Sequence, residues 1–437
     1  MPNSTVSFVA TGDSFITRTS PPHPKWEQLT EFIKSHDVRF TNLETTIRDN
    51  EGFPAAQSGG TWASAHPQVL QHLQSYGFNV LSIANNHMLD YSYGGLAATE
   101  KYINELHLLY CGAGSTLHAA SKPKYLETLQ GRIAVIAVTS TFHESAIAGE
   151  DRADCTGRPG INPLRYDTVH QISHTHMASL KQLVAATSIN AEINIAMQHG
   201  HLLDQLPDSF FMFGEYDFVA VDNASQEGTL TTCNPIDLQR IYQSIHEAKR
   251  QADYVILSVH SHEMKEENEA EPADFLKEFC RGCIDEGAHA MICHGPHQIR
   301  GIEIYQERPI FYGLGNFIFQ NETVEALPAD FYHHLNLNHT HNIADLMDKK
   351  SKNGTSSFGA DPKFWHSFIP SWTMENGQLV DLSIHPISLG HELPRYRRGC
   401  PVFNAQSSIM DQLNQLSASY HVYFDIQADG TARWQRS

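Results

Sequence analysis

Polar side chains that can bind metal ions or carry protons follow five separate apolar runs of the sequence. They are Asp13, Glu44, Asn86, His87, His260, His262, His294 and His297. Any one of them alone is more often a cap or a loop hydrogen-bonding group, but five such runs together indicate a site. Carboxylate, amide oxygen and neutral imidazole favour Mn, Fe, Zn or Ni over Ca or Mg. A carboxylate that bridges two ions fits a two-metal hydrolytic site, so we expect one or two divalent ions.

The apolar runs alternate with helical patterns, which indicates an α/β fold. Strands are predicted at 6–13, 38–44 and 132–141, and a helix near 25–35. A helix followed by a strand is predicted within each of 69–87, 94–114, 236–262 and 274–297. Because the runs lack inside–outside alternation, both faces of each sheet should be covered. In open α/β sheets, ligands bind at the carboxyl ends of the strands. The predicted fold is therefore an α/β sandwich whose polar strand ends converge on one rim.

Two regions interrupt this pattern. Residues 1–320 are predicted to form the catalytic domain, with an insertion at 142–235 packed near the strand ends. Within the insertion, AEINIAMQHGH is predicted to be a strand, and IFYGLGNFIF at 310–319 a pair of strands joined by a turn. Residues 321–437 should add a lid loop, a hairpin that turns at Asn376-Gly377 and a helix near 404–418, packed on the same domain.

Composition excludes several classes of protein. A net charge of −19 argues against a nucleic-acid binder and against an anionic membrane surface as partner. We expect no signal peptide and no membrane segment, because no stretch approaches the roughly 18 apolar residues that a span requires. Seven cysteines indicate reduced thiols in a cytoplasmic protein, and the CxxC of Cys280 and Cys283 should serve core packing inside a helix. The oligomeric state is not predicted.

Several motifs make the chain recognisable. They are GD at 12–13, NLE at 42–44, ANNHMLDYSYGGL at 84–96, CGAG at 111–114, VHSHE at 259–263, HGPHQIRGIE at 294–303 and GLGNFIF at 313–319. In order and spacing the sequence resembles the CapA family (poly-γ-glutamate capsule biosynthesis proteins), a branch of the calcineurin-like metallophosphatase fold. The resemblance extends over residues 5–141 and 236–320. It implies a sandwich of α-β-β-α layers.

The resemblance also implies a role for each strand-end residue. Asp13 and His297 would hold one metal, Glu44 would bridge, and Asn86, His260 and His294 would hold the second metal. His87 would be the catalytic imidazole. Asp90, three residues later, lies on the right face to orient that ring if a helix begins there.

Three positions depart from the family pattern. Phe15 stands where metallophosphatases usually place a histidine, so the first metal would have few ligands and a single ion is plausible. Ser261-His262 replaces a common Trp-Gly pair, and His262 is either an additional ligand or a substrate contact. Arg300 either pairs with a substrate carboxylate or phosphate, or lies on a solvated loop.

Family resemblance favours a metal-dependent hydrolase or acyl-transfer enzyme, with a metal-activated water and His87 as acid. The expected substrate is peptide-like or polyglutamate-like, and rich in carboxylates. A peptide epimerase is the alternative, with His87 and Asp90, or Asp13 with His294 or His297, as acid–base pairs at a Cα. A non-catalytic capsule-assembly protein is a further alternative.

Overall fold

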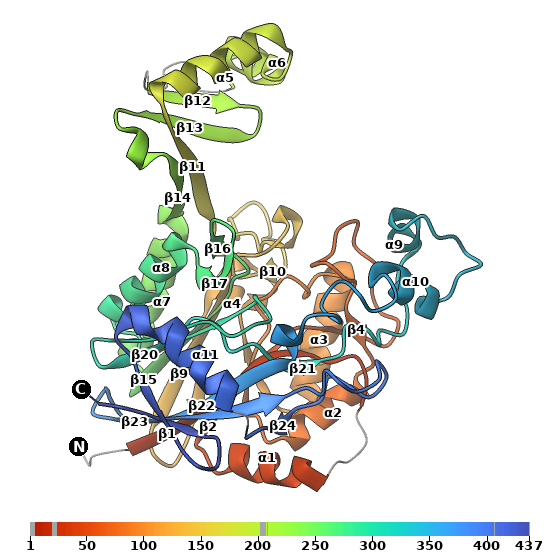
Figure 1. Cartoon of the computed structure of the whole chain (residues 1–437), viewed down its shortest axis with the longest axis vertical. Helices are drawn as coiled ribbons and strands as arrows, with labels where there is room; N and C mark the ends of the chain where they lie inside the picture. The colour runs from red at the N-terminus through yellow and green to blue at the C-terminus, as the bar shows by residue number, and fades with distance from the viewer. Residues whose placement is uncertain (1–4, 20–23, 202–206, 208, 406, 437) are drawn as a thin grey trace.

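Two β-sheets pack face to face and helices cover both outer surfaces (Figure 1). The computed structural model describes residues 5–19, 24–201, 207, 209–405 and 407–436. The apolar core between the sheets includes Phe8 and Trp372, whose rings stack at 5.2 Å, together with Ile256 and Ile292 from the opposite sheet. The expected α-β-β-α layers are therefore confirmed.

The first sheet has ten strands, in the order β25-β26-β23-β22-β1-β2-β5-β6, with β21 paired to β1 and β24 to β23. Their bounds are β1 (Thr5–Phe15), β2 (Val38–Leu43), β5 (Val80–Ser82), β6 (Leu109–Cys111), β21 (Asn316–Phe319), β22 (His366–Glu375), β23 (Gln378–Ser388), β24 (Val402–Phe403), β25 (Phe424–Ile426) and β26 (Ala432–Trp434). Strands β1, β2, β5 and β6 run parallel, so their carboxyl ends share one edge.

The second sheet has six strands in the order β19-β20-β18-β15-β9-β8. Their bounds are β8 (Lys124–Glu127), β9 (Arg132–Thr139), β15 (Tyr254–His260), β18 (Ala290–His294), β19 (Ile302–Tyr305) and β20 (Arg308–Phe311). The inner strands β9, β15, β18 and β20 are parallel, and His260 lies opposite His294 in the register of β15 and β18. The polar ends of two adjacent strands are thus brought side by side.

Helices bury one apolar face each against the sheets. On the first sheet these are α1 (Pro24–Lys34), α2 (Gln68–Ser75) and α3 (Ser92–Glu105), and on the second α7 (Pro235–Lys249) and α8 (Asp274–Glu286). In α8 the buried residues recur every three or four positions, and the helix ends at Gly287, whose φ of 115° is left-handed. Cys280 and Cys283 lie buried on this face as free thiols, so the predicted packing role is confirmed.

The chain crosses between the sheets at 312–315, so the predicted strand pair at 310–319 is wrong. β20 pairs with β18 and β19, whereas β21 pairs with β1. The crossing brings the Gly315 carbonyl against β1, where it accepts a hydrogen bond of 3.0 Å from the Asp13 N–H. A Cβ at Gly12 would lie 2.0 Å from that carbonyl oxygen, so only glycine fits there.

Residues 166–233, which we call the arm, form a separate sheet that projects from the two main sheets (Figure 1). Its elements are β11 (Tyr166–Ser173), α5 (His174–Ala186), α6 (Ala191–Gln198), β12 (Phe210–Phe213), β13 (Tyr216–Val221) and β14 (Gly228–Cys233), with strand order β12-β13-β11-β14. The predicted strand in AEINIAMQHGH is wrong because this segment contains α6. Its alternating isoleucines resemble a strand, but alanine, glutamate, methionine and glutamine favour a helix.

The C-terminal region completes the first sheet. The predicted hairpin is present as β22 and β23, with Asn376 (φ 52°) and Gly377 (φ 81°) in the turn, and β22 pairs with β1. The predicted helix is α11 (Ser407–Ser417). The segment expected to be a lid loop contains the helix α10 (Ile343–Lys350), and the helix α9 (Ala329–His334) precedes it. Among the described residues, no helix has the length and apolar character needed to cross a membrane.

Candidate metal centre

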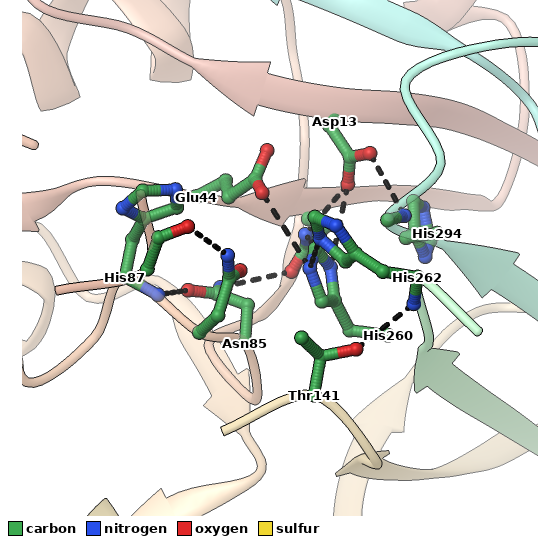
Figure 2. A network of polar contacts seen from close by, with 12 residues as sticks. Asp13, Glu44, Asn85, His87, Thr141, His260, His262 and His294 are labelled. Carbon is green, nitrogen blue, oxygen red and sulfur yellow. Dashed lines mark hydrogen bonds and ion pairs between the residues drawn. The ribbon is translucent and has the colours of Figure 1, made fainter. Parts of the chain in front are cut away.

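Asp13, Glu44, His87, His260, His262 and His294 gather where strands of the two sheets end (Figure 2). Asp13 lies in β1 and Glu44 follows β2, and both side chains are fully buried. The loop after β5 contributes His87, and β15 and β18 end at His260 and His294. The predicted convergence of strand ends is present.

Glu44 lies at the centre of this group, and none of the residues that the structure describes donates a hydrogen bond to its carboxylate. Both carboxylate oxygens are buried without a partner, while Oε1 lies 3.5 Å from His260 Nε2 and 3.7 Å from His297 Nε2. Burial, followed by the charges of Asp13 and Asp90, raises the pKa of Glu44 well above its usual range. An ionised carboxylate buried without donors is costly unless a cation compensates it. The residues therefore fit a metal ion.

Among the residues that the structure describes, two groups of ligand atoms lie close enough to share an ion, and both contain Glu44. Asp13, Glu44 and His260 form one, and Glu44, His262 and His297 form the other, with the ligand atoms of each within 4.8 Å of one another. The shared Glu44 fits the predicted bridging position. In these groups His260 lies with Asp13 and His297 with His262. His297 Nδ1 also lies 3.7 Å from Asp13 Oδ2, so the pairing of Asp13 with His297 that the family resemblance implies stays a prediction.

Backbone and amide groups hold Asp13 in place. Its Oδ1 accepts a hydrogen bond of 2.8 Å from Asn42 Nδ2, and its Oδ2 accepts one of 3.0 Å from the Gly295 N–H. Asn42 was not assigned a role from the sequence, although it belongs to the NLE motif. The carboxylate is thus oriented before any ion binds.

The side-chain amide nitrogen of Asn86 is hydrogen-bonded, and its oxygen is not. Its Nδ2 donates to the Gly59 carbonyl at 2.9 Å, while its buried Oδ1 has no partner and is the atom that would bind a cation. The preceding Asn85 shapes the loop, because its Nδ2 donates to the Leu43 carbonyl at 2.8 Å and its Oδ1 accepts the His87 N–H at 3.1 Å. Asn86 as a ligand stays a prediction that the orphaned oxygen supports.

His294 is buried but belongs to neither ligand group. Its Nε2 donates to the Thr11 carbonyl at 3.1 Å, and its Nδ1 lies 3.5 Å from the Ser258 hydroxyl. Only Nδ1 is therefore left for an ion, and the ligand role of His294 also stays a prediction.

His297 presents one nitrogen to Glu44. Its Nδ1–H donates to Asn316 Oδ1 at 2.9 Å, which leaves Nε2 unprotonated. Burial lowers the pKa of His297, and burial together with neighbouring imidazoles lowers the pKa of His260 and His262 well below the usual value. Neutral imidazole is the form that binds metal ions.

The expected contact between His87 and Asp90 is present. His87 Nδ1 and Asp90 Oδ2 lie 2.7 Å apart, and Asp90 also accepts the Gly59 N–H at 2.9 Å and the Ala63 N–H at 2.7 Å. The segment between them is a turn, and α3 begins two residues later than Asp90. Phe15 packs edge-on against the His87 ring at 5.1 Å, so it shapes the pocket of that ring and offers no ligand.

Arg300 is buried, with 1% of its surface exposed. The alternative that Arg300 lies on a solvated loop is therefore wrong. Its Nε donates to the Glu269 carbonyl at 3.0 Å, and its Nη1 has no partner within the described part of the chain. Burial lowers the pKa of Arg300 to about 10. Its contact with a substrate anion stays a prediction.

Glu263 was not assigned a role from the sequence. Its carboxylate accepts hydrogen bonds from the hydroxyls of Ser140 at 2.7 Å, Thr141 at 3.0 Å and Ser261 at 2.8 Å. The Thr141 hydroxyl oxygen in turn accepts the His262 N–H at 2.9 Å. Glu263 therefore fixes the loop that carries His262. The glutamate that ends VHSHE was the available signal.

A family model described as bacterial capsule synthesis protein PGA_cap matches residues 7–321. The chain is 29% identical over 441 residues to Uncharacterized protein y4sH of Sinorhizobium fredii, covering 96% of this chain and 91% of the relative. It is 22% identical over 296 residues to Capsule biosynthesis protein CapA of Bacillus anthracis, covering 67% of this chain and 53% of the relative.

Among solved structures, the chain has a weak likeness to a hypothetical protein from Thermus thermophilus. The TM-score is 0.39 at 10% sequence identity, covering 87% of this chain and 98% of that one.

Proposed function

Because the chain belongs to the bacterial capsule synthesis protein PGA_cap family, we propose that it is a metal-dependent hydrolase or acyl-transfer enzyme. Its substrate is peptide-like or polyglutamate-like. One observation carries the proposal: the buried Glu44 carboxylate has no donor, yet it is shared by two groups of ligands.

The residues that would hold the ion or ions are Asp13, Glu44, Asn86, His260, His262, His294 and His297. A bound divalent ion supplies Lewis acidity, which polarises the carbonyl or phosphoryl group under attack and lowers the pKa of water. The protein holds Asp13 and His297 in fixed orientations through Asn42 and Asn316.

His87 is the proposed proton carrier. Asp90 binds its Nδ1, so Nε2 is the atom that gives a proton to the leaving nitrogen or oxygen. Asp90 is itself held by the Gly59 and Ala63 N–H groups, and its charge stabilises the imidazolium form of His87. Hydrolysis then adds water across the scissile bond, and the proton from His87 ends on the leaving group.

The test combines elemental analysis with a substrate assay. Protein purified without added metal, and after incubation with Mn²⁺, should retain a divalent ion. With γ-linked glutamyl peptides, His87→Ala should reduce turnover by about 10²- to 10⁴-fold while metal content is unchanged. His174→Ala, an exposed histidine of the arm, is the matched control.

Running the assay in deuterated water separates the alternatives. Cleavage into fragments supports the proposal, whereas deuterium at Cα without cleavage would identify a peptide epimerase. Failure to bind any divalent ion would refute both enzymatic functions and leave an assembly role.

A further inference from the structure

The loop formed by residues 55–63, which we call the strap, surrounds Asp90 with backbone N–H groups. The Gly59 N–H donates to Asp90 Oδ1 at 2.9 Å, and the Ala63 N–H donates to Asp90 Oδ2 at 2.7 Å. The Ala55 N–H donates to the backbone carbonyl of Asp90 at 2.9 Å. Because Asp90 is buried, these three donors determine where its carboxylate lies.

The strap also contacts Asn86, and it does so at Gly59. The Gly59 carbonyl accepts a hydrogen bond of 2.9 Å from Asn86 Nδ2, which leaves Asn86 Oδ1 for an ion. A Cβ added to Gly59 would lie 2.7 Å from Asn86 Nδ2 and 2.8 Å from the Asn86 carbonyl oxygen. A side chain at this position would therefore force the strap and Asn86 apart. Gly59 is needed for this close approach of two segments of the chain.

The C-terminal region holds the strap at two further residues. Lys350, the last residue of α10, donates from Nζ to the Thr61 hydroxyl at 2.7 Å. The ring of Trp62 packs 5.8 Å from the ring of Phe331 in α9, and Lys350 Nζ lies 5.4 Å from the centre of that same ring. Thr61, Trp62 and Phe331 are all buried. The strap is thus packed between the loop that carries Asp90 and the two helices α9 and α10.

Lys350 contributes a charge that no carboxylate matches within the part of the chain that the structure describes. Its acidic neighbour Glu322 is paired with Arg398, whose Nε lies 2.7 Å from Glu322 Oε2. Burial lowers the pKa of Lys350. A partly desolvated ammonium group without a carboxylate adds little net stability. Its consequence in this structure is the fixed position of the Thr61 hydroxyl.

We propose that the strap and the helices α9 and α10 form one positioning unit for the metal centre. In this unit Gly59 sets the amide of Asn86 and the carboxylate of Asp90 together. Lys350 fixes the strap through the Thr61 hydroxyl. Gly59 and Lys350 are positioning residues, because neither is a ligand or a proton carrier. The expected effect on turnover rests on the proposed function, whereas the effects on metal binding and on the strap do not.

Gly59→Ala tests the contact with Asn86 through metal binding. The added methyl group should displace the Asn86 amide, so the affinity for Mn²⁺ should fall by about 10- to 100-fold, as for other residues that orient metal ligands. The absorption spectrum of the Co²⁺ form should also shift, because the ligand geometry changes. Gln57→Ala, at an exposed position of the strap, is the matched control. Unchanged affinity and spectrum in Gly59→Ala would overturn the role of Gly59.

A double-mutant cycle tests the contact between Lys350 and Thr61. Lys350→Met and Thr61→Val remove the same hydrogen bond, so each should lower kcat for γ-linked glutamyl peptides by about 2- to 10-fold with little change in KM. The double variant should be no slower than the slower single variant, because one contact is lost only once. Lys349→Met, at the exposed neighbouring position of α10, should match the wild type. Losses that multiply in the double variant would show that Lys350 does not act through Thr61.

Hydrogen exchange gives a measurement that needs neither metal nor substrate, and it decides the proposal even where Gly59→Ala does not fold. The Gly59 and Ala63 N–H groups should exchange about 2- to 10-fold faster in Lys350→Met and in Thr61→Val than in the wild type. Exchange at the wild-type rate in both variants would show that the strap is held without α10, and would overturn the positioning unit.

Failure of the positioning unit and failure of the proposed function give different results. A wild-type protein that binds Mn²⁺ but cleaves no peptide would refute the hydrolase. The metal affinity of Gly59→Ala and the hydrogen exchange of Lys350→Met would then still decide the positioning unit. A wild-type protein that cleaves peptides, with both variants cleaving them equally fast, would refute the positioning unit and leave the proposed function intact.

Discussion

The metal centre and the arm are built in opposite ways from the same chain. At the centre, Asp13, Glu44 and His260 lie on the carboxyl ends of packed strands and are almost completely buried. In the arm, Met177 and Asn190 are the two buried residues among those the structure describes. Apolar side chains such as Ile195, which is 52% exposed, remain in contact with water there.

This difference shows what chemistry requires of the fold. Orphaned acceptors such as the Glu44 carboxylate persist where the surrounding core holds them against their desolvation cost. The arm has no core of that kind, so local opening should cost it little free energy. The following predictions test the contrast, from the largest expected effect to the smallest.

Two isoleucines compare the packing of the two regions directly. Ile256→Ala, in the core between the sheets, should lower the free energy of unfolding by about 2–5 kcal/mol. Ile195→Ala in α6 should change it by less than about 0.5 kcal/mol, because this side chain is half exposed. Urea denaturation of both variants measures the difference, and equal losses would show that the arm has a core of its own.

Glu44→Gln should separate metal binding from folding. With Mn²⁺ at about 100 times its Kd, the wild-type protein should gain about 2.7 kcal/mol of stability, and the variant should gain almost none. Without metal the variant should be at least as stable, because the amide removes a carboxylate whose pKa is raised by burial. Thermal unfolding with and without Mn²⁺ tests this, and an undiminished metal response in the variant would remove Glu44 from the site.

Glu263→Gln should weaken metal binding by about 10- to 100-fold through the loop that carries His262. The exposed Glu267→Gln is the control, with unchanged affinity expected. The absorption spectrum of the Co²⁺ form should shift only in Glu263→Gln, since a positioning change alters ligand geometry. Identical spectra would show that Glu263 does not orient His262.

Acid should affect the two regions in different pH windows. Burial lowers the pKa of both His289 and His385 from 6.5 to about 4. Between these two pH values the unfolded chain therefore binds protons at both residues and the folded chain does not. The two main sheets with their helices should therefore lose stability as the pH falls from about 6.5 towards 4.

In the arm, hydrogen bonds from Ser173 and His176 lower the pKa of Glu227 from 4.5 to about 2. This contribution is present above about pH 4.5 and is lost as the pH falls towards about 2. Hydrogen exchange across this range measures both regions, and an arm that responds first, at a pH of about 6, would contradict the assignment.

Most of the two main sheets could be predicted from the sequence because the patterns that indicate their strands are local. Continuous apolar runs ended at Asp13, Glu44 and His260, and parallel strands necessarily bring such ends to one edge. The spacing of His87 and Asp90 allowed their contact to be expected, and a turn rather than a helix provides it. The sequence indicated an insertion at 142–235, but its helix α6 was predicted as a strand, because AEINIAMQ carries a strand-like alternation within a helix-forming composition.

The sequence by itself determined the chemistry available at the strand ends, the layer order and the family. Only the tertiary structure decided which atoms meet. Whether His297 groups with Asp13 or with His262 depends on distances between two sheets, and the crossing at Gly315 depends on how those sheets pack.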